Sequence, residues 1–122
     1  MAEDRKDLRS RTRDYASATV KLYCSLLTGR TEVQVVGKQL LRSGTAVGAL
    51  YREASRARSD AEFVSKIETC IQEADESDLW LDLLEADCGI RTESLTWLKR
   101  ETEEMICILV TVVKNVKNRN SK

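Results

Sequence analysis

The sequence contains no proline, no histidine and only five glycines among 122 residues. Because proline and glycine most often interrupt helices, their scarcity favours long, uninterrupted helices. Aromatic residues make up 5% of the chain, whereas 42% of the residues are hydrophobic and 33% are charged. This composition is typical of amphipathic helices with a heavily charged surface, and the length suits one domain with a single core.

The missing histidine excludes several kinds of catalytic and metal site. Ser-His and Cys-His pairs are excluded, as is the di-iron centre of ferritin-like bundles, which needs a Glu-x-x-His motif on each of two helices. No glycine-rich phosphate loop is present. The cysteines lack the paired spacing of zinc ligands, so we expect reduced thiols buried in apolar helix faces; they are Cys24, Cys70, Cys88 and Cys107. We therefore expect no enzyme activity, metal, cofactor or small-molecule substrate.

Two pairs of carboxylates lie one helical turn apart, Glu73 with Glu76 and Glu101 with Glu104. Such a pair could hold a hard cation weakly. We favour the simpler interpretation, in which both pairs belong to solvated helix surface.

The net charge is zero, with twenty basic and twenty acidic side chains. A neutral protein is not drawn strongly to nucleic acid or to an anionic membrane. The first residues lack the apolar core of a secretory signal, and the apolar run at 105–113 is about half as long as a bilayer requires. We therefore expect a cytoplasmic protein without a membrane-spanning segment.

Apolar residues repeat at helical spacing in four segments, at about 4–27, 31–56, 60–87 and 93–117. Thr31 and the capping box Ser59 to Glu62 are predicted to start helices, whereas Gly29 and Gly89 are predicted to end them. The basic tail after the last segment is expected to fray. Residues 1–122 are thus predicted to form a single all-α domain, an antiparallel up-and-down four-helix bundle.

Gly44 and Gly48 lie inside the second predicted helix, where each glycine costs about 1 kcal/mol relative to alanine. Close packing is the interpretation that we favour, because small residues let another helix approach the backbone. Both glycines are therefore predicted to face a neighbouring helix.

Basic and acidic residues are segregated between the second and third predicted helices. The basic set is predicted to contact a partner or RNA, although pairing with the acidic helix of the same chain is the favoured alternative; it comprises Arg42, Tyr51, Arg52, Arg56 and Arg58. The acidic set is predicted to form an interface; it comprises Glu73, Asp75, Glu76 and Asp78. Trp80 and Trp97 are expected to be core or interface anchors rather than platforms for stacking.

Residues 40–84 resemble the signature of the bacterial four-helix-bundle family also called the ribosomal RNA intervening-sequence proteins. The matching parts are Leu41-Arg42-Ser43-Gly44-Thr45, Val47-Gly48-Ala49, Arg52-Glu53-Ala54, Ala61-Glu62-Phe63 and Glu73-Ala74-Asp75-Glu76-Ser77. The chain departs from the family at Leu50, where asparagine is common. The resemblance implies a four-helix bundle that forms a homopentamer.

Some members of that family are encoded within intervening sequences of large-subunit ribosomal RNA genes. A related branch, the accessory variability determinant of diversity-generating retroelements, binds a reverse transcriptase and nucleic acid through a basic surface, whereas this chain is neutral. We therefore expect a non-catalytic oligomeric interaction protein, with RNA or ribonucleoprotein binding through the basic surface as the alternative.

Overall fold

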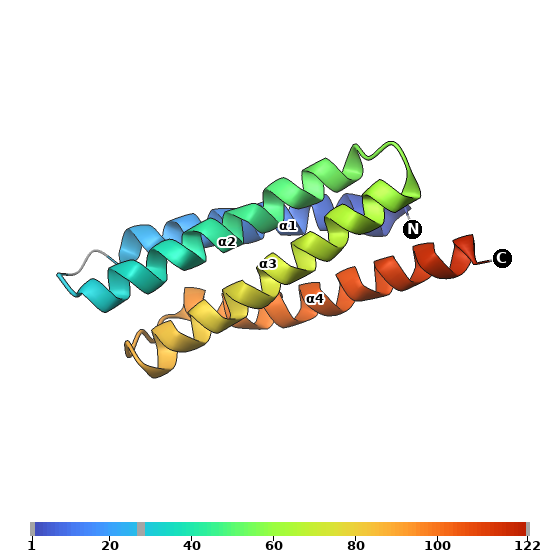
Figure 1. Ribbon diagram of the computed structural model, residues 1–122. Coiled ribbons are helices and arrows are strands. Elements are labelled where there is room, and N and C mark those ends of the chain that lie inside the picture. The colour runs from blue at the N-terminus through green and yellow to red at the C-terminus, as the bar shows by residue number, and fades with distance from the viewer. Residues whose placement is uncertain (1, 27–28, 122) are drawn as a thin grey trace.

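Four helices account for nearly all of the computed structural model, which describes residues 2–26 and 29–121. Figure 1 shows the chain running up and down the bundle, so that both termini lie at the same end. No strand occurs in the part that the structure describes. The predicted all-α four-helix bundle is therefore confirmed, with the helices α1 (Ala2–Ser25), α2 (Thr31–Ser55), α3 (Asp60–Ala86) and α4 (Glu93–Asn120).

Side-chain caps fix the starts of α3 and α4. The Ser59 hydroxyl accepts a hydrogen bond from the Glu62 amide, as predicted. The Glu62 carboxylate accepts from the amide of Arg58 at 2.9 Å, one residue before the expected cap. Thr92 caps α4 in the same way, by accepting from the amide of Leu95.

Gly89 ends α3 as predicted, because its φ of 72° is left-handed and lets the amide of Ile90 donate to the carbonyl of Leu84. Gly29 directly follows residues 27–28, which lie outside the described residues, so its role at the end of the first helix stays a prediction. Thr31 is the first residue of α2 and not its N-cap; the N-cap is Arg30, which forms no side-chain cap hydrogen bond.

The predicted helix boundaries agree with the structure to within a few residues, but the C-terminal tail is helical where fraying was predicted. The tail was expected to fray, yet α4 continues to Asn120. Lys117 pairs with Glu68 at 3.1 Å and Arg119 pairs with Asp60 at 3.2 Å, so contacts to α3 hold this last part of the helix. Leu27, the predicted end of the first helix, lies outside the described residues.

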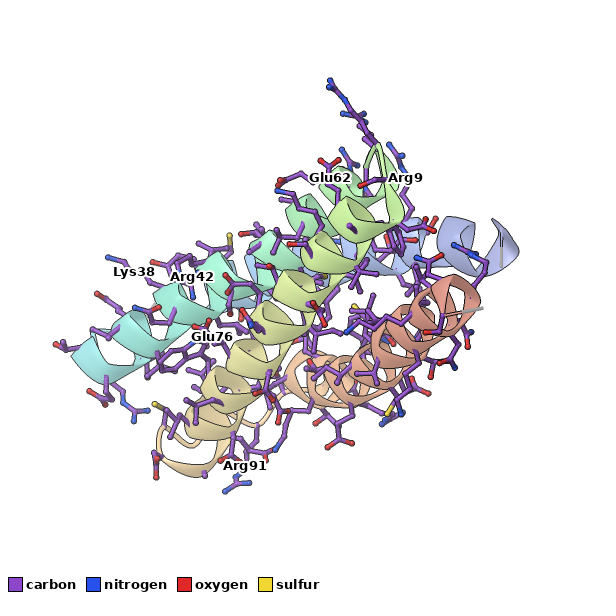
Figure 2. The ribbon with its side chains drawn as sticks, turned by 45° about the vertical axis from the view of Figure 1, so that its right-hand side comes forward. Arg9, Lys38, Arg42, Glu62, Glu76 and Arg91 are labelled. Atoms are coloured by element: carbon purple, nitrogen blue, oxygen red, sulfur yellow. The ribbon has the colours of Figure 1, made fainter. Side chains whose placement is uncertain are left out.

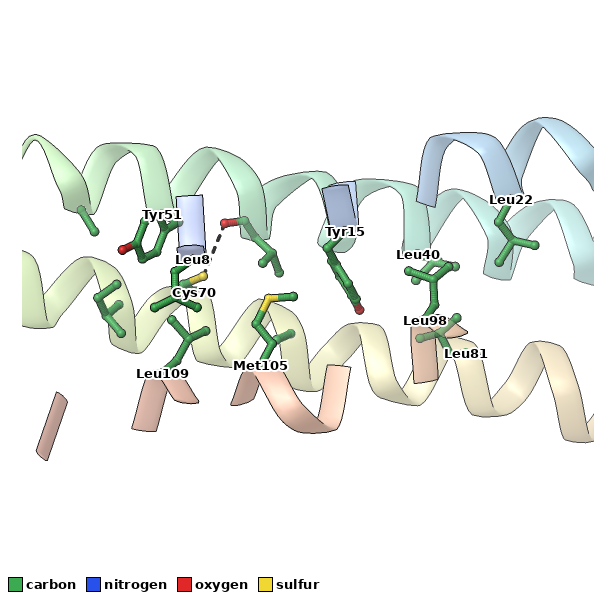
Figure 3. Packing of buried hydrophobic residues seen from close by; sticks show 14 of the residues in the cluster. Leu8, Tyr15, Leu22, Leu40, Tyr51, Cys70, Leu81, Leu98, Met105 and Leu109 are labelled. Carbon is green, nitrogen blue, oxygen red and sulfur yellow. Dashed lines mark hydrogen bonds between the residues drawn. The ribbon is translucent and has the colours of Figure 1, made fainter. Parts of the chain in front are cut away.

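Aliphatic side chains from all four helices meet in a single core, which Figure 3 shows from close by. Cys70 is buried there and its thiol donates to the carbonyl of Val47 at 3.4 Å. Cys88 is also buried, but Cys24 and Cys107 are exposed, so the prediction of four buried thiols is wrong for these two.

The glycines of α2 face α1. A methyl group at Gly44 would lie 2.9 Å from Cβ of Thr19, which is closer than two such carbon atoms approach. At Gly48 it would lie 3.2 Å from both the Ala16 methyl group and the Thr12 carbonyl oxygen. The two glycines thus allow the backbones of α1 and α2 to approach each other closely.

None of the described helices combines enough length with enough apolar character to cross a membrane.

Candidate interaction surfaces

Arg42 projects from α2 toward α3 and pairs with two acidic residues of the same chain. Its guanidinium donates to Glu76 at 2.9 Å and to Glu73 at 3.3 Å, and Figure 2 shows Arg42 and Glu76 side by side. Arg42 therefore pairs within its own chain, which is the alternative that the sequence analysis favoured. Glu73 and Glu76, which were predicted to form an acidic interface, therefore pair with Arg42 of the same chain.

Tyr51 does not lie on the surface with the arginines. Its side chain is 1% exposed and belongs to the core cluster, so its predicted role in contacting a partner or RNA is wrong. The reason is its helical position, because Tyr51 follows Val47 and Gly48 by one turn and points inward with them.

Four arginines gather where α2 turns into α3, and we call this group the arginine end. Arg52, Arg56 and Arg58 come from α2 and the turn, while Arg9 reaches the same end from α1. Among the described residues, none of their guanidinium groups forms a salt bridge or a side-chain hydrogen bond. Figure 2 shows Arg9 beside Glu62 at this end of the bundle. The sequence analysis missed Arg9, which is remote in sequence from the other three.

Two shallow depressions lie between these arginines. One is lined by Arg9, Arg58 and Phe63, and the other by Arg52, Arg56 and Lys66. Lys66 differs from the arginines because it pairs with Glu53 at 2.8 Å, and this hydrogen bond raises the pKa of the ammonium group. The surplus positive charge of the arginine end is therefore carried by guanidinium groups, which suit planar carboxylates and phosphates.

Four carboxylates from α3 and α4 lie near one another; we call Asp75, Asp78, Asp82 and Glu103 the acidic flank. Partial burial, together with repulsion from Glu103, raises the pKa of Asp78. Lys99 lies beside them, but its main partner is Glu85 at 2.8 Å. Asp75 and Asp78 were predicted to form an interface, and the structure places both on this flank.

One carboxylate is buried between helices, although the sequence analysis assigned it to solvated surface. Glu101 of α4 is 8% exposed, and Arg11 of α1 holds both of its oxygens, at 2.7 Å and 3.0 Å. Glu104 also lies within 3.6 Å of Arg11. Arginine therefore neutralises both carboxylate pairs, and no group of possible metal ligands occurs among the described side chains.

Hydroxyl groups from all four helices meet in the middle of the bundle. Tyr15 of α1 bonds Thr102 of α4 at 2.6 Å, and Ser43 of α2 bonds Ser77 of α3 at 2.7 Å. Burial raises the pKa of Tyr15 to about 12, although the hydrogen bond with Thr102 acts in the opposite direction. We call these four residues the polar layer.

The two tryptophans occupy different environments. Trp80 packs against the core, and its buried indole Nε1 has no hydrogen-bond partner among the described residues. Trp97 is 41% exposed near the start of α4, so it is not a core anchor, and the alternative of an interface anchor stays a prediction. Its ring lines an open depression at the end of the bundle opposite the arginine end.

Comparisons with known proteins agree with the fold. The family model described as "23S rRNA-intervening sequence protein" matches residues 7–111. A crystal structure of a protein with unknown function from the S23 ribosomal protein family of Bacteroides thetaiotaomicron VPI-5482 is 32% identical to this chain, with a TM-score of 0.81. The similarity covers 91% of this chain and 98% of that one. A search of curated proteins found no match.

The family match spans most of the chain and includes parts of all four helices. It also includes residues 40–84, which carry the sequence resemblance. The chain therefore belongs to the 23S rRNA-intervening sequence protein family.

Proposed function

We propose that the protein is a non-catalytic interaction protein that assembles with copies of itself, the arginine end of one copy contacting the acidic flank of the next. The observation that carries this proposal is that four guanidinium groups have no carboxylate partner among the described residues, while elsewhere a set of carboxylates repel one another. A contact between two different surfaces is heterologous, and it closes into a ring when the rotation between copies permits. The ring that we propose is a homopentamer.

The electrostatics of both surfaces support this contact. Partial burial is the largest cause of the raised pKa of Asp78, and repulsion from Glu103 and the other carboxylates adds to it; cations from a second copy would relieve that repulsion. Guanidinium groups form charge-assisted, two-pronged hydrogen bonds with carboxylates. The net charge of zero lets copies meet without overall repulsion.

The non-catalytic part of the proposal rests on how the polar groups inside the bundle are used. Arg11 holds Glu101, and the hydroxyl groups of the polar layer bond one another. These groups hold the helices together, and neither set combines a nucleophile with a base.

Sedimentation velocity tests the assembly directly. We expect the wild-type protein to sediment as a closed oligomer at low salt and to dissociate partly at high salt, because its contacts are ionic. The double variant Arg56→Glu/Arg58→Glu should be monomeric, as should Asp75→Lys/Asp82→Lys. Mixing the two variants should restore association, since each supplies the charge that the other has reversed.

A matched control changes charge elsewhere on the surface. Lys38→Glu/Lys114→Glu alters exposed residues outside both surfaces and should leave the sedimentation coefficient unchanged. A wild-type protein that stays monomeric at every concentration would contradict the proposal. Variants at the arginine end that keep the wild-type mass would contradict it equally.

A second candidate function is RNA binding through the arginine end. It is favoured by the same cluster of guanidinium groups, which match phosphate geometry, and by the reference to 23S rRNA in the name of the family. Retardation of a structured RNA should then weaken steeply with salt and disappear in Arg56→Glu/Arg58→Glu. Absence of retardation at low salt would exclude this function.

A further inference from the structure

We propose that the depression around Trp97 binds an unpaired nucleotide of single-stranded nucleic acid, with the base stacked on the indole ring and the phosphate held by Arg91 and Arg100. This site lies at the turn between α3 and α4, whereas the arginine end lies at the turn between α2 and α3. It is therefore separate from the arginine end, whereas Lys99 links Glu85 of its lining to Asp82 of the acidic flank.

Trp97 is an exposed tryptophan that lines a depression at the surface. The depression has a volume of about 820 Å³, which is within the usual range for small-ligand sites. Trp97 is 41% exposed and makes no hydrogen bond or ring contact within the described part of the chain. An indole that is exposed beside a hollow of this size offers one flat face to a planar ligand.

The charges near the ring favour an anionic ligand. Arg100 follows Trp97 by one helical turn, and Arg91 lies in the turn before α4; Figure 2 shows Arg91 at this end of the molecule. Neither arginine forms a salt bridge with a described residue. Of the two carboxylates in the lining, Glu85 already pairs with Lys99 at 2.8 Å, which leaves Glu93.

The lining also distinguishes a nucleotide from a peptide. Trp97 is its single apolar side chain, so an aliphatic side chain or an amphipathic helix would find too little apolar surface to bury. A base needs only the face of one aromatic ring. The hydroxyl groups of Thr92, Ser94 and Thr96 complete the lining and can bond a ribose or a base edge. The composition of the site therefore matches a base with its phosphate.

Tryptophan fluorescence measures binding at this site. Trp80→Phe removes the other tryptophan, so that quenching reports on Trp97 alone. The probes are a short single-stranded oligonucleotide, a mononucleotide, a duplex of the same sequence and inorganic phosphate. We expect the single strand to quench Trp97 most strongly, the mononucleotide more weakly, and the duplex and phosphate not at all, because only an unpaired base can stack.

Variants separate stacking from charge, with binding followed by the anisotropy of a labelled oligonucleotide. Trp97→Ala should weaken binding about tenfold, and Trp97→Phe should recover part of the loss. Arg100→Gln should weaken binding and reduce its salt dependence. The matched control Lys114→Gln removes an exposed charge of α4 far from Trp97 and should leave affinity for the single strand nearly unchanged.

Several outcomes would overturn the proposal. Equal binding of duplex and single strand would show that the charge alone is recognised. Unchanged affinity of Trp97→Ala would exclude stacking, as would the absence of quenching by every probe at low salt. If Trp97→Ala instead lowered the mass of the assembly while nucleotide binding stayed as in the wild type, the ring would belong to a contact between copies.

Discussion

The phenolic oxygen of Tyr15 lies 2.6 Å from the hydroxyl oxygen of Thr102, and this hydrogen bond joins α1 to α4. Thr102 already donates its proton to the carbonyl of Leu98 at 2.6 Å, so Tyr15 is the donor between the two side chains. Since α1 and α4 are the first and last helices of the chain, the bond closes the bundle where no connecting turn does so.

Replacing Tyr15 with phenylalanine removes this bond while keeping the ring. We expect the free energy of unfolding to fall by about 1 kcal/mol, because Thr102 keeps its bond to the Leu98 carbonyl and only one interhelical hydrogen bond is lost. Urea unfolding followed by circular dichroism measures the change. Tyr23→Phe is the matched control, since Tyr23 is a half-buried tyrosine of the same helix. Equal losses in the two variants would mean that the bond contributes nothing specific.

Stability should decrease at alkaline pH. Burial raises the pKa of Tyr15 from 10.0 to about 12 and that of Cys70 from 9.0 to about 12. Both groups hold their protons more tightly in the folded state, so their contribution is complete below pH 9 and is lost as the pH rises toward 12.

The double variant Tyr15→Phe/Cys70→Ala should therefore lose less free energy of unfolding between pH 9 and pH 11 than the wild type does. Chemical unfolding in the presence of a reductant measures the two pH profiles. Cys24→Ala changes an exposed thiol and should follow the wild-type profile. Parallel profiles for the double variant and the wild type would contradict the pKa shifts.

The effect of Gly44→Ala on stability should change sign when Thr19 is also replaced. In the wild type, the added methyl group would press against Thr19, and we expect a loss of about 1–3 kcal/mol of folding free energy. In a Thr19→Gly background, Cβ and both γ atoms of Thr19 are absent, so the same substitution should stabilise α2 by up to about 1 kcal/mol. A double-mutant cycle by thermal or urea unfolding reports this reversal, and Gly29→Ala, where a methyl group meets nothing within 4 Å, is the control.

The fold was predictable because its signals are local. Ser59 caps α3 and Gly89 allows the turn after it, and both can be identified from the residues next to them. Periodicity places an apolar stripe on each helix, but it fixes the edges of that stripe less well. Cys107 illustrates this limit: it stands between two half-buried isoleucines, yet its own thiol is exposed.

The surfaces were harder to predict because they join residues that are remote in sequence. Arg9 belongs to the arginine end and Arg11 to a buried ion pair, but both stand in one charged stretch of α1. The neighbouring residues in the sequence do not distinguish Arg9 from Arg11. The packing of α1 against α2 and α4 gives each its own surroundings. For Tyr51, helical periodicity had indicated the buried position, and its nearness to the arginines in sequence was misleading.

The pair of Arg11 and Glu101 should contribute much more to stability than the pairs of Arg42. Arg11→Met leaves the Glu101 carboxylate, which is 8% exposed, without its main cation, and we expect a loss of about 3 kcal/mol. Arg42→Met breaks contacts of an arginine side chain that is half exposed, so it should lower the free energy of unfolding by less than about 1 kcal/mol.

The double variant Arg11→Met/Glu101→Met decides whether charge is the cause of that loss. If the penalty comes from an uncompensated buried charge, removing both charges should restore much of the stability lost in Arg11→Met. Urea unfolding of the four proteins in this cycle measures the coupling. Stability no higher in the double variant than in Arg11→Met would instead attribute the loss to the packing of the arginine stem between α1 and α4.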